Sequence, residues 1–360
     1  MSPTNANSIY NKINVKRVAR CALPVLEKGS RLTKTNLDAL IVKEQSGFFW
    51  AEVADGTVYM CRLRGRLMEA AQSSDIAAIG DRVQISIVEN DESGEKGVIE
   101  AVEERRSVLS RSARTVGNRG GGDALREHVI IANADTIFFV LAAAQPAPKL
   151  HLLDRMLVAG EKSEIEELVI VVNKIDIEDP TIIKEQFAPY QAMGYTVLHT
   201  SAKDGRGVDA LRELLRGKIS AFTGLSGVGK TSLLNNLQPD LGRQVKQVSA
   251  YHQEGVHTTR DSALIKLPED IYGAGTYLAD TPGMRYLNIY DVEPEELDGY
   301  FRDIAAYVDR CKFNNCRHSK DDRGCAVRQA AQDGAISKSR YKSYMKLRLE
   351  LEDSLTALYG

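Results

Sequence analysis

Short stretches that alternate between apolar and polar residues follow residue 40. Such alternation is typical of half-buried β-strands, and glycine-containing turns separate the stretches. About 70 residues with roughly five strands fit a small barrel of the oligonucleotide-binding (OB) class, although an SH3-like barrel would give the same pattern. The predicted strands include residues 48–53, 57–63, 82–88 and 97–102.

The pattern changes at residue 135, where continuous apolar runs begin to alternate with helical stretches. This rhythm is typical of an α/β domain in which helices cover a parallel sheet on both faces. The predicted strands are 136–141, 168–172, 196–199, 219–223, 263–267 and 275–279, and the predicted helices are 149–160, 180–192, 208–215 and 230–237. Beyond Pro294 the chain is expected to be mainly helical.

A glycine-rich segment between a predicted strand and a predicted helix carries the first chemical signal. It matches G-x-x-x-x-G-K-[ST], the phosphate-binding loop of nucleotide-hydrolysing enzymes. In such a loop, backbone N–H groups and the helix N-terminus bind phosphate oxygens, so we expect Lys230 to reach the β- and γ-phosphates and Thr231 to bind Mg²⁺. The predicted nucleotide contacts here are Gly224, Leu225, Ser226, Gly227, Val228, Gly229, Lys230, Thr231 and Ser232.

Two further loops indicate which base is bound. Asn173-Lys174-Ile175-Asp176 follows one predicted strand, and Ser201-Ala202-Lys203 follows the next. A carboxylate at Asp176 can accept from both the ring N–H and the exocyclic amine of guanine, whereas adenine would leave it unpaired. We therefore predict GTP and GDP as ligands.

Residues 280–283 read Asp-Thr-Pro-Gly, a D-x-x-G element at a strand end. In GTPases this element holds Mg²⁺ through water at the Asp, and its Gly N–H senses the γ-phosphate, so Asp280 and Gly283 are predicted site residues. The preceding loop contains His257, Thr258 and Thr259. Either threonine could complete Mg²⁺ coordination, and such loops become ordered when GTP is bound.

These elements occur in a permuted order. The base-reading loops precede the phosphate loop, whereas ordinary GTPases have the phosphate loop first. A parallel sheet tolerates such a permutation when the original termini lie close together. The loop at 280–290 then leads directly into the C-terminal region, so loss of the γ-phosphate could move that region.

The C-terminal region contains a cluster of metal ligands. Cys311, Cys316, His318 and Cys325 lie within fifteen residues. Four soft or borderline donors without a carboxylate indicate a closed, structural zinc site. The five cysteines of the chain are an odd number, which argues against a disulfide framework.

Charge adds one more signal. The chain has a net charge of −2, yet residues 1–35 carry seven basic residues against one acid and residues 310–350 carry eleven against four. Two basic ends around an acidic centre could dock on phosphate, or the ends could simply aid solubility. No apolar run of about 18 residues and no secretory signal is present, so we expect a cytoplasmic protein without a membrane partner.

Together these motifs resemble the circularly permuted GTPases of the RsgA (YjeQ) family, over about residues 36–335. The resemblance also covers Ile79-Gly-Asp81-Arg-Val83, Arg106–Arg111 and Asn133-Ala-Asp135. One departure is the His318–Cys325 spacing, which is one residue longer than usual. The family implies an OB domain, a permuted GTPase domain and a zinc domain, with the small ribosomal subunit and its rRNA as partners.

The resemblance also implies the catalytic residues. Met284 follows Gly283, where many GTPases carry a glutamine, and a thioether cannot orient water. The family implies that His257 takes this role, with Lys230 and Thr259 as further catalytic residues. His257 could instead only cap its loop, and Arg260 replaces a threonine common in the family.

The sequence thus predicts a multidomain protein and a function. The expected parts are a flexible basic tail (1–35), an OB-fold β-barrel (36–111), a Gly-rich linker or mobile loop (112–123), a circularly permuted α/β GTPase domain (124–293) and a mostly helical zinc domain (294–360). We expect a monomeric GTPase whose hydrolysis the small subunit stimulates. The alternatives are an RNA-binding protein that uses guanine nucleotide only as a structural or regulatory ligand, and a metabolic P-loop kinase, which Asn173–Asp176 disfavours.

Overall fold

The computed structural model describes residues 36–70, 75–87, 96–114, 125–239, 241–242, 262–280 and 292–359. The predicted basic tail (1–35) lies outside these residues, as does most of the predicted Gly-rich linker.

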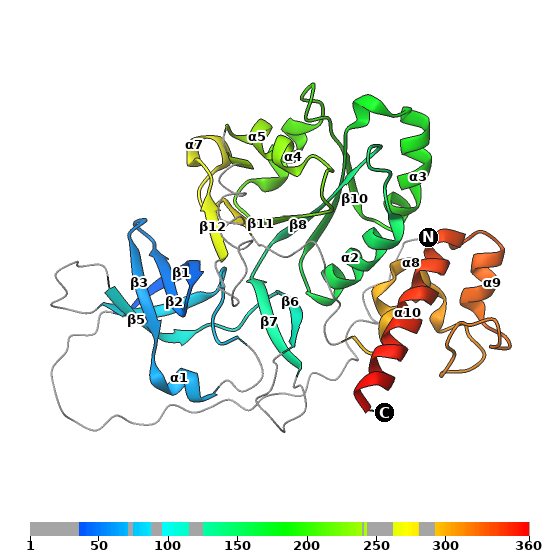
Figure 1. The fold of residues 1–360 in the computed structure, drawn as a ribbon, viewed down its shortest axis with the longest axis horizontal. Coiled ribbons are helices and arrows are strands. Elements are labelled where there is room, and N and C mark those ends of the chain that lie inside the picture. Colours follow the sequence, from blue (N-terminus) through cyan, green and yellow to red (C-terminus); the bar gives the residue numbers. More distant parts are fainter. Residues whose placement is uncertain are drawn as a thin grey trace, which may run out of the picture. The chain divides into compact units, whose positions relative to one another are not determined.

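Five strands near the N-terminus form a closed barrel (Figure 1). They are β1 (Asn36–Gln45), β2 (Phe48–Val53), β3 (Val58–Leu63), β4 (Arg82–Ile87) and β5 (Lys96–Val102), in the order β1-β2-β3-β5-β4, and β4 pairs back to β1. Helix α1 (Gly65–Ala70) follows β3. Fully buried isoleucines at positions 41, 85 and 99 fill the interior, as the alternating pattern predicts. The OB-like barrel is confirmed.

A separate two-stranded hairpin follows the barrel. Strand β6 (Val108–Arg114) pairs antiparallel with β7 (Leu125–Ala132). Residues 112–114 therefore belong to a strand, whereas the sequence pattern places them in a linker. Residues 108–111, which the same pattern assigns to the barrel, also lie in this hairpin and not in the barrel sheet.

The central domain is a six-stranded sheet with helices on both faces. Its strands are β8 (Thr136–Ala142), β9 (Glu167–Asn173), β10 (Thr196–His199), β11 (Ile219–Thr223), β12 (Ser262–Lys266) and β13 (Tyr277–Asp280), in the order β10-β9-β8-β11-β13-β12. The helices are α2 (Leu150–Lys162), α3 (Pro180–Ala192), α4 (Val208–Leu215), α5 (Lys230–Leu237) and the short α7 (Glu269–Tyr272), with the 3₁₀ turn η2 (Ile175–Ile177).

Strand β8 explains the layering, because every residue in it is buried. Its side chains alternate between two cores. Ile137 and Phe139 face the core that contains residues of α2 and α3, and Phe138 and Val140 face the core that contains residues of α4 and α5. A strand buried on both faces reads as a continuous apolar run, which is the observed pattern.

One strand departs from the parallel pattern. Strand β12 runs antiparallel to β13, and its other edge pairs with β1 of the barrel, with Lys43 opposite Ala263 and Glu44 opposite Ser262. The barrel and the central sheet therefore share a continuous run of strands. Lys266 also forms an ion pair with Glu52 of β2, with 2.7 Å between Nζ and Oε1.

The C-terminal part is helical. It contains η3 (Leu297–Tyr300), α8 (Arg302–Val308), α9 (Ala326–Gln332) and α10 (Lys338–Tyr359), which pack around a core that includes Phe301, Ile304 and Tyr344. Val158 of α2 belongs to the same core. Among the described residues, no helix is both long and apolar enough to cross a membrane.

Candidate nucleotide site and metal centre

The predicted phosphate loop connects β11 to α5, as its motif requires. Two of its glycines are needed for close contacts with neighbouring loops. At Gly224 (φ +150°) a Cβ would lie 2.2 Å from the carbonyl oxygen of Val140, and at Gly229 (φ +90°) it would lie 2.4 Å from Nδ2 of Asn173. Only glycine tolerates both the conformation and the space, so the motif glycines seat this loop against β8 and β9.

The other loop residues differ in exposure. Val228 is buried, Leu225 is half-buried, and Ser226 and Gly227 are exposed. Lys230 begins α5, and its Nζ donates to the carbonyls of Gly224 and Leu225, 2.8 Å away for Leu225. The lysine thus curls over the loop, where its ammonium group can meet phosphate oxygens. Thr231 and Ser232 follow in the first turn of α5 and are exposed.

Asn173, at the end of β9, ties three loops together. Its Nδ2 donates to the carbonyl of Val228 at 3.0 Å, and its Oδ1 accepts from the backbone N–H of Ala202 at 3.1 Å and from Oγ1 of Thr200 at 3.3 Å. The residue is fully buried. Its side chain therefore fixes the positions of the phosphate loop and the Ser201–Lys203 loop relative to each other.

Asp176 lies in η2, three residues after Asn173. Its Oδ1 accepts from Oγ of the buried Ser201 at 2.9 Å, and Nζ of Lys203 lies 3.9 Å from its Oδ2. The Asp176 side chain is 12% exposed. The structure therefore fixes one carboxylate oxygen and leaves the group partly accessible, so that a base could reach it.

Lys174 adds a second link to the phosphate loop. Its backbone is left-handed (φ +62°), and its Nζ donates to the carbonyls of Gly227, at 2.7 Å, and Gln145. The two base-reading loops and the phosphate loop thus meet at the carboxyl ends of β9, β10 and β11, although Asn173 and Val228 are 55 residues apart in sequence. Ligands bind at this edge of open α/β sheets.

Several predicted site residues lie outside the described residues. These are His257, Thr258, Thr259 and Gly283. Asp280 is the last residue of β13, and the structure describes its backbone only. Because β13 lies next to β11, the chain enters the D-x-x-G element beside the phosphate loop.

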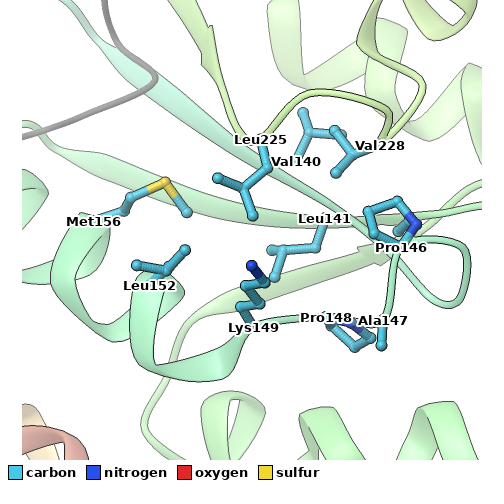
Figure 2. Close-up of a pocket in the computed structure, with 11 residues that line it drawn as sticks. Val140, Leu141, Pro146, Ala147, Pro148, Lys149, Leu152, Met156, Leu225 and Val228 are labelled. Atoms are coloured by element: carbon cyan, nitrogen blue, oxygen red, sulfur yellow. The ribbon is translucent and has the colours of Figure 1, made fainter.

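A small apolar pocket lies beside the phosphate loop (Figure 2). Leu225 and Val228 of the loop and Leu152 and Met156 of α2 line it, together with residues of the 146–149 segment. Asp176 and Lys230 do not line this pocket, so it is distinct from the nucleotide position that the polar loops define.

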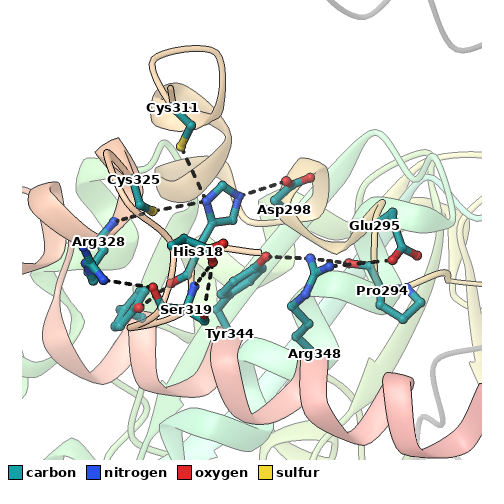
Figure 3. A network of polar contacts seen from close by, with 12 residues as sticks. Pro294, Glu295, Asp298, Cys311, His318, Ser319, Cys325, Arg328, Tyr344 and Arg348 are labelled. Atoms are coloured by element: carbon teal, nitrogen blue, oxygen red, sulfur yellow. Dashed lines mark hydrogen bonds and ion pairs between the residues drawn. The ribbon is translucent and has the colours of Figure 1, made fainter. Parts of the chain in front are cut away.

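The predicted metal ligands form one cluster in the C-terminal part, and Figure 3 shows three of them, Cys311, His318 and Cys325. The ligand atoms of Cys311, Cys316, His318 and Cys325 all lie within 4.8 Å of one another. Nδ1 of His318 lies 3.6 Å from Sγ of Cys311 and 3.5 Å from Sγ of Cys325. A tetrahedral zinc ion at ordinary bond lengths places sulfur and nitrogen ligands about 3.6 Å apart. The donor set and its spacing therefore fit zinc.

Burial controls the chemistry of these thiols. It raises the pKa of Cys316 to about 12 and also raises the pKa of Cys325. Thiols in such surroundings stay protonated at neutral pH, and a bound divalent cation supplies the positive charge that stabilises thiolates. The longer spacing between His318 and Cys325 does not prevent the four ligands from meeting, since the intervening loop folds with Asp322 accepting hydrogen bonds from Ser319.

Sequence reasoning missed Asp298, whose Oδ2 lies 3.2 Å from Nε2 of His318. No spacing signal connects it to the ligands, because it precedes the first cysteine by thirteen residues on another element. A buried histidine ligand needs a hydrogen-bond partner for its second ring nitrogen. That requirement is the signal that could have prompted a search for a carboxylate near His318.

Known proteins with the same arrangement were found at the levels of family, sequence and structure. The family model of the RsgA GTPase matches residues 102–290. Two curated relatives, each described as small ribosomal subunit biogenesis GTPase RsgA, come from Chlorobaculum tepidum (35% identical; 87% of this chain and 98% of the relative) and Thermotoga petrophila (38%; 82% and 90%).

Solved structures agree with this assignment. The crystal structure of YjeQ from Thermotoga maritima has a TM-score of 0.66 at 33% identity, covering 88% of this chain and 98% of that one. YloQ, described as a circularly permuted GTPase, has a TM-score of 0.65 at 29% identity, covering 91% and 99%. This chain is a GTP-hydrolysing enzyme and belongs to the RsgA family of circularly permuted GTPases.

Proposed function

We propose that this protein acts in ribosome biogenesis by binding the small ribosomal subunit and hydrolysing GTP, and that the subunit stimulates hydrolysis. The observation that carries the proposal is that one chain contains a β-barrel, three loops that meet at the carboxyl end of a parallel sheet and a Cys₃His cluster. The names of the relatives, small ribosomal subunit biogenesis GTPase, support the same assignment.

Different loops of the nucleotide site contact the base and the phosphates. Asp176 accepts from guanine, and Ser201 and Ala202 close the base side with Lys174 and Lys203. The residues of the phosphate loop, with Lys230, bind the β- and γ-phosphates. Mg²⁺ would be held by Thr231, by Thr258 or Thr259, and through water by Asp280, and it would neutralise charge that develops on the phosphates.

Hydrolysis needs a water in line with the γ-phosphate. Met284 cannot orient it, so we assign this role to His257, whose imidazole can accept a hydrogen bond from water near neutral pH. Docking on the subunit would fix the loop that carries His257, which accounts for stimulation by a partner.

Two surfaces suit ribosomal RNA. On the zinc domain, eight basic residues are exposed: Arg310, Lys312, Arg317, Lys320, Arg323, Lys338, Lys342 and Lys346. Phe313 stands among them with 50% exposure, and Nζ of Lys312 lies 5.5 Å from its ring centroid. On the barrel, Lys43 lies over Trp50 and Arg62 over Phe48. Cations beside aromatic rings can bind phosphate while the rings stack on unpaired bases.

The proposal is tested by measuring GTP turnover with no addition, with small subunits and with large subunits. We expect slow turnover alone and marked stimulation by small subunits only. His257→Ala should lose the stimulation while retaining GDP binding, whereas His252→Ala, a nearby histidine in the sequence, should keep it. Equal rates in all three conditions would contradict the ribosomal assignment. They would favour the alternative, in which nucleotide serves as a regulatory ligand.

A further inference from the structure

The imidazole of His318 is held from both sides. Its Nδ1 faces the sulfur atoms of Cys311 and Cys325, and its Nε2 lies 3.2 Å from Oδ2 of Asp298 (Figure 3). The His318 side chain is 1% exposed, and Asp298 is 18% exposed. With Nδ1 in the cluster, only Nε2 remains to carry the ring proton, and Asp298 is placed to accept it.

The backbone at His318 shows why such a partner matters. The backbone of this residue is left-handed (φ +60°), a conformation that residues other than glycine seldom adopt. Its carbonyl accepts a hydrogen bond from the hydroxyl of Tyr341, and its ring lies 5.9 Å from that of Tyr344. The surrounding structure thus fixes the backbone and ring position, while Asp298 fixes which nitrogen is free for a metal.

Asp298 belongs to η3, in the segment 292–300 that follows the D-x-x-G region in sequence. Arg348 of α10 anchors the same segment, because its guanidinium donates to the carbonyl of Pro294 at 2.8 Å and lies 3.7 Å from Glu295. Leu297 is fully buried in the zinc-domain core. The segment that joins the GTPase domain to the zinc domain is therefore fastened on one side by α10 and on the other by the metal cluster.

We propose that Asp298 is a positioning residue of the metal centre. By accepting from Nε2–H of His318 it presents Nδ1 to the metal, and through it metal binding stabilises the segment 292–300. Outer partners of this kind commonly change metal affinity by 10- to 100-fold. Linkage requires the reverse effect as well, so a bound metal holds Asp298 and its segment in place. The inference rests on the proposed zinc site and is independent of GTP hydrolysis.

Zinc affinity, measured on the full chain by competition with a chromogenic chelator, tests the first part. We expect Asp298→Ala to weaken zinc binding about 10- to 100-fold, and Asp298→Asn to weaken it less because an amide oxygen can still accept. Glu293→Gln is the matched control, since this carboxylate lies on the same segment and is exposed. It should stay within about twofold of wild type, a margin well below that expected for an outer partner.

Hydrogen exchange of residues 292–300 tests the second part. Zinc should slow exchange there in the wild type and in Glu293→Gln but not in Asp298→Ala. A protein labelled with ¹⁵N-histidine should show the proton of His318 on Nε2 when zinc is bound.

Two results would overturn the inference. One is an Asp298→Ala protein that binds zinc as tightly as wild type, and the other is a wild-type segment whose exchange does not respond to zinc. A wild type that binds no zinc would overturn the zinc site as well. Circular dichroism and GDP binding report whether each variant is folded, and if Asp298→Ala does not fold, Asp298→Asn carries the same test.

Discussion

At the scale of single residues, the nucleotide site separates two roles that its motif combines. Asn173 links the loops through its buried side chain, whereas the Asp176 carboxylate beside Ser201 is partly accessible. A contiguous motif indicates that its residues act together, but it does not indicate which of them touch a ligand and which hold the loops. That distinction depends on distances between loops that are far apart in sequence.

Asp176 should determine the choice of base. Asp176→Ala removes the acceptor for two hydrogen bonds from guanine, so GDP affinity should fall about 100-fold or more, since each charged hydrogen bond contributes roughly 1.5–3 kcal/mol. Fluorescence titration with a labelled GDP measures the change. Asp204→Ala is the control, because this exposed carboxylate pairs with Arg206 on the same loop. Equal affinities for the two variants would contradict the assignment.

Gly229 should be intolerant of any side chain. In Gly229→Ala the new Cβ would lie 2.4 Å from Nδ2 of Asn173, in addition to the cost of a positive φ, which is about 1–2 kcal/mol. Gly334→Ala has a similar φ of +81° with no atom within 4 Å, so it isolates the conformational cost. Thermal unfolding and GDP titration should show a larger loss for Gly229→Ala. If both variants lose the same stability and bind GDP equally, the close approach of Gly229 to Asn173 does not constrain the phosphate loop.

At the scale of elements, the sequence predicts a strand better when both of its faces are buried than when it has polar residues at its start. The strands of the central sheet read as apolar runs because helices cover both faces. The sequence pattern does not predict strands β1, β6 and β7. Strand β1 begins in a polar stretch (Asn36-Leu37-Asp38), β7 begins with Leu125-Arg126-Glu127-His128, and β6 ends in the segment that the pattern assigns to a linker. Pairing supplies their backbone hydrogen bonds, and the side-chain pattern alone does not indicate it: β1 pairs with β2, β4 and β12, and β6 pairs with β7.

A buried ionic cluster joins α10 to α2, and no local pattern predicts it. Arg340, 2% exposed, pairs with Asp154 of α2 at 2.6 Å and with Asp303 of α8 at 2.8 Å. Tyr190 of α3 donates to the same Asp154 oxygen at 2.7 Å. Burial, with the charge of Asp154, raises the pKa of Tyr190, which therefore stays a neutral donor. These groups are up to 186 residues apart and meet only in the folded chain.

Removing the cation from this cluster should be costly. Arg340→Met leaves Asp154 charged and buried, so the free energy of unfolding should fall by about 3–5 kcal/mol. Arg155→Met is the control from the same pair of helices, since Arg155 and its partner Glu350 are 30% and 41% exposed. Its loss should be below about 1 kcal/mol. Urea denaturation compares the two, and similar midpoints would argue against a desolvated cluster.

At the scale of the whole molecule, the contact between the barrel and the central sheet is the feature least visible in the sequence. Strand β1 pairs with β12 at Ser262 and Ala263, directly after the loop that contains His257 to Thr259. A partner bound to the barrel would therefore act on a strand adjacent to that loop. The order of the domains could be predicted from motifs. The pairing of β1 with β12, in contrast, depends on backbone contacts between strands about 220 residues apart.

The zinc-domain surface should contribute to RNA binding through Phe313. Phe313→Ala should weaken binding to small subunits about 5- to 100-fold, as expected when one aromatic–base stack is lost. Phe313→Trp should retain binding, because an indole also stacks. Leu349→Ala, which removes an apolar side chain that is 53% exposed on α10, is the control. Co-sedimentation at fixed salt measures these affinities, and a Phe313→Ala protein that binds as Leu349→Ala does would exclude stacking at this site.

The central claim is the proposed one, that the protein docks on the small ribosomal subunit and that docking stimulates GTP hydrolysis by fixing the loop with His257. If GTP orders the same loop, linkage requires the bound nucleotide to change the affinity for the subunit. The most direct test of this claim is the affinity of the full chain for isolated small subunits with a non-hydrolysable GTP analogue, with GDP and without nucleotide. The account predicts binding that is tighter with the analogue than with GDP by about tenfold, within the usual range of coupling between two sites. Equal affinities in the three states, or equal binding to large subunits, would contradict it.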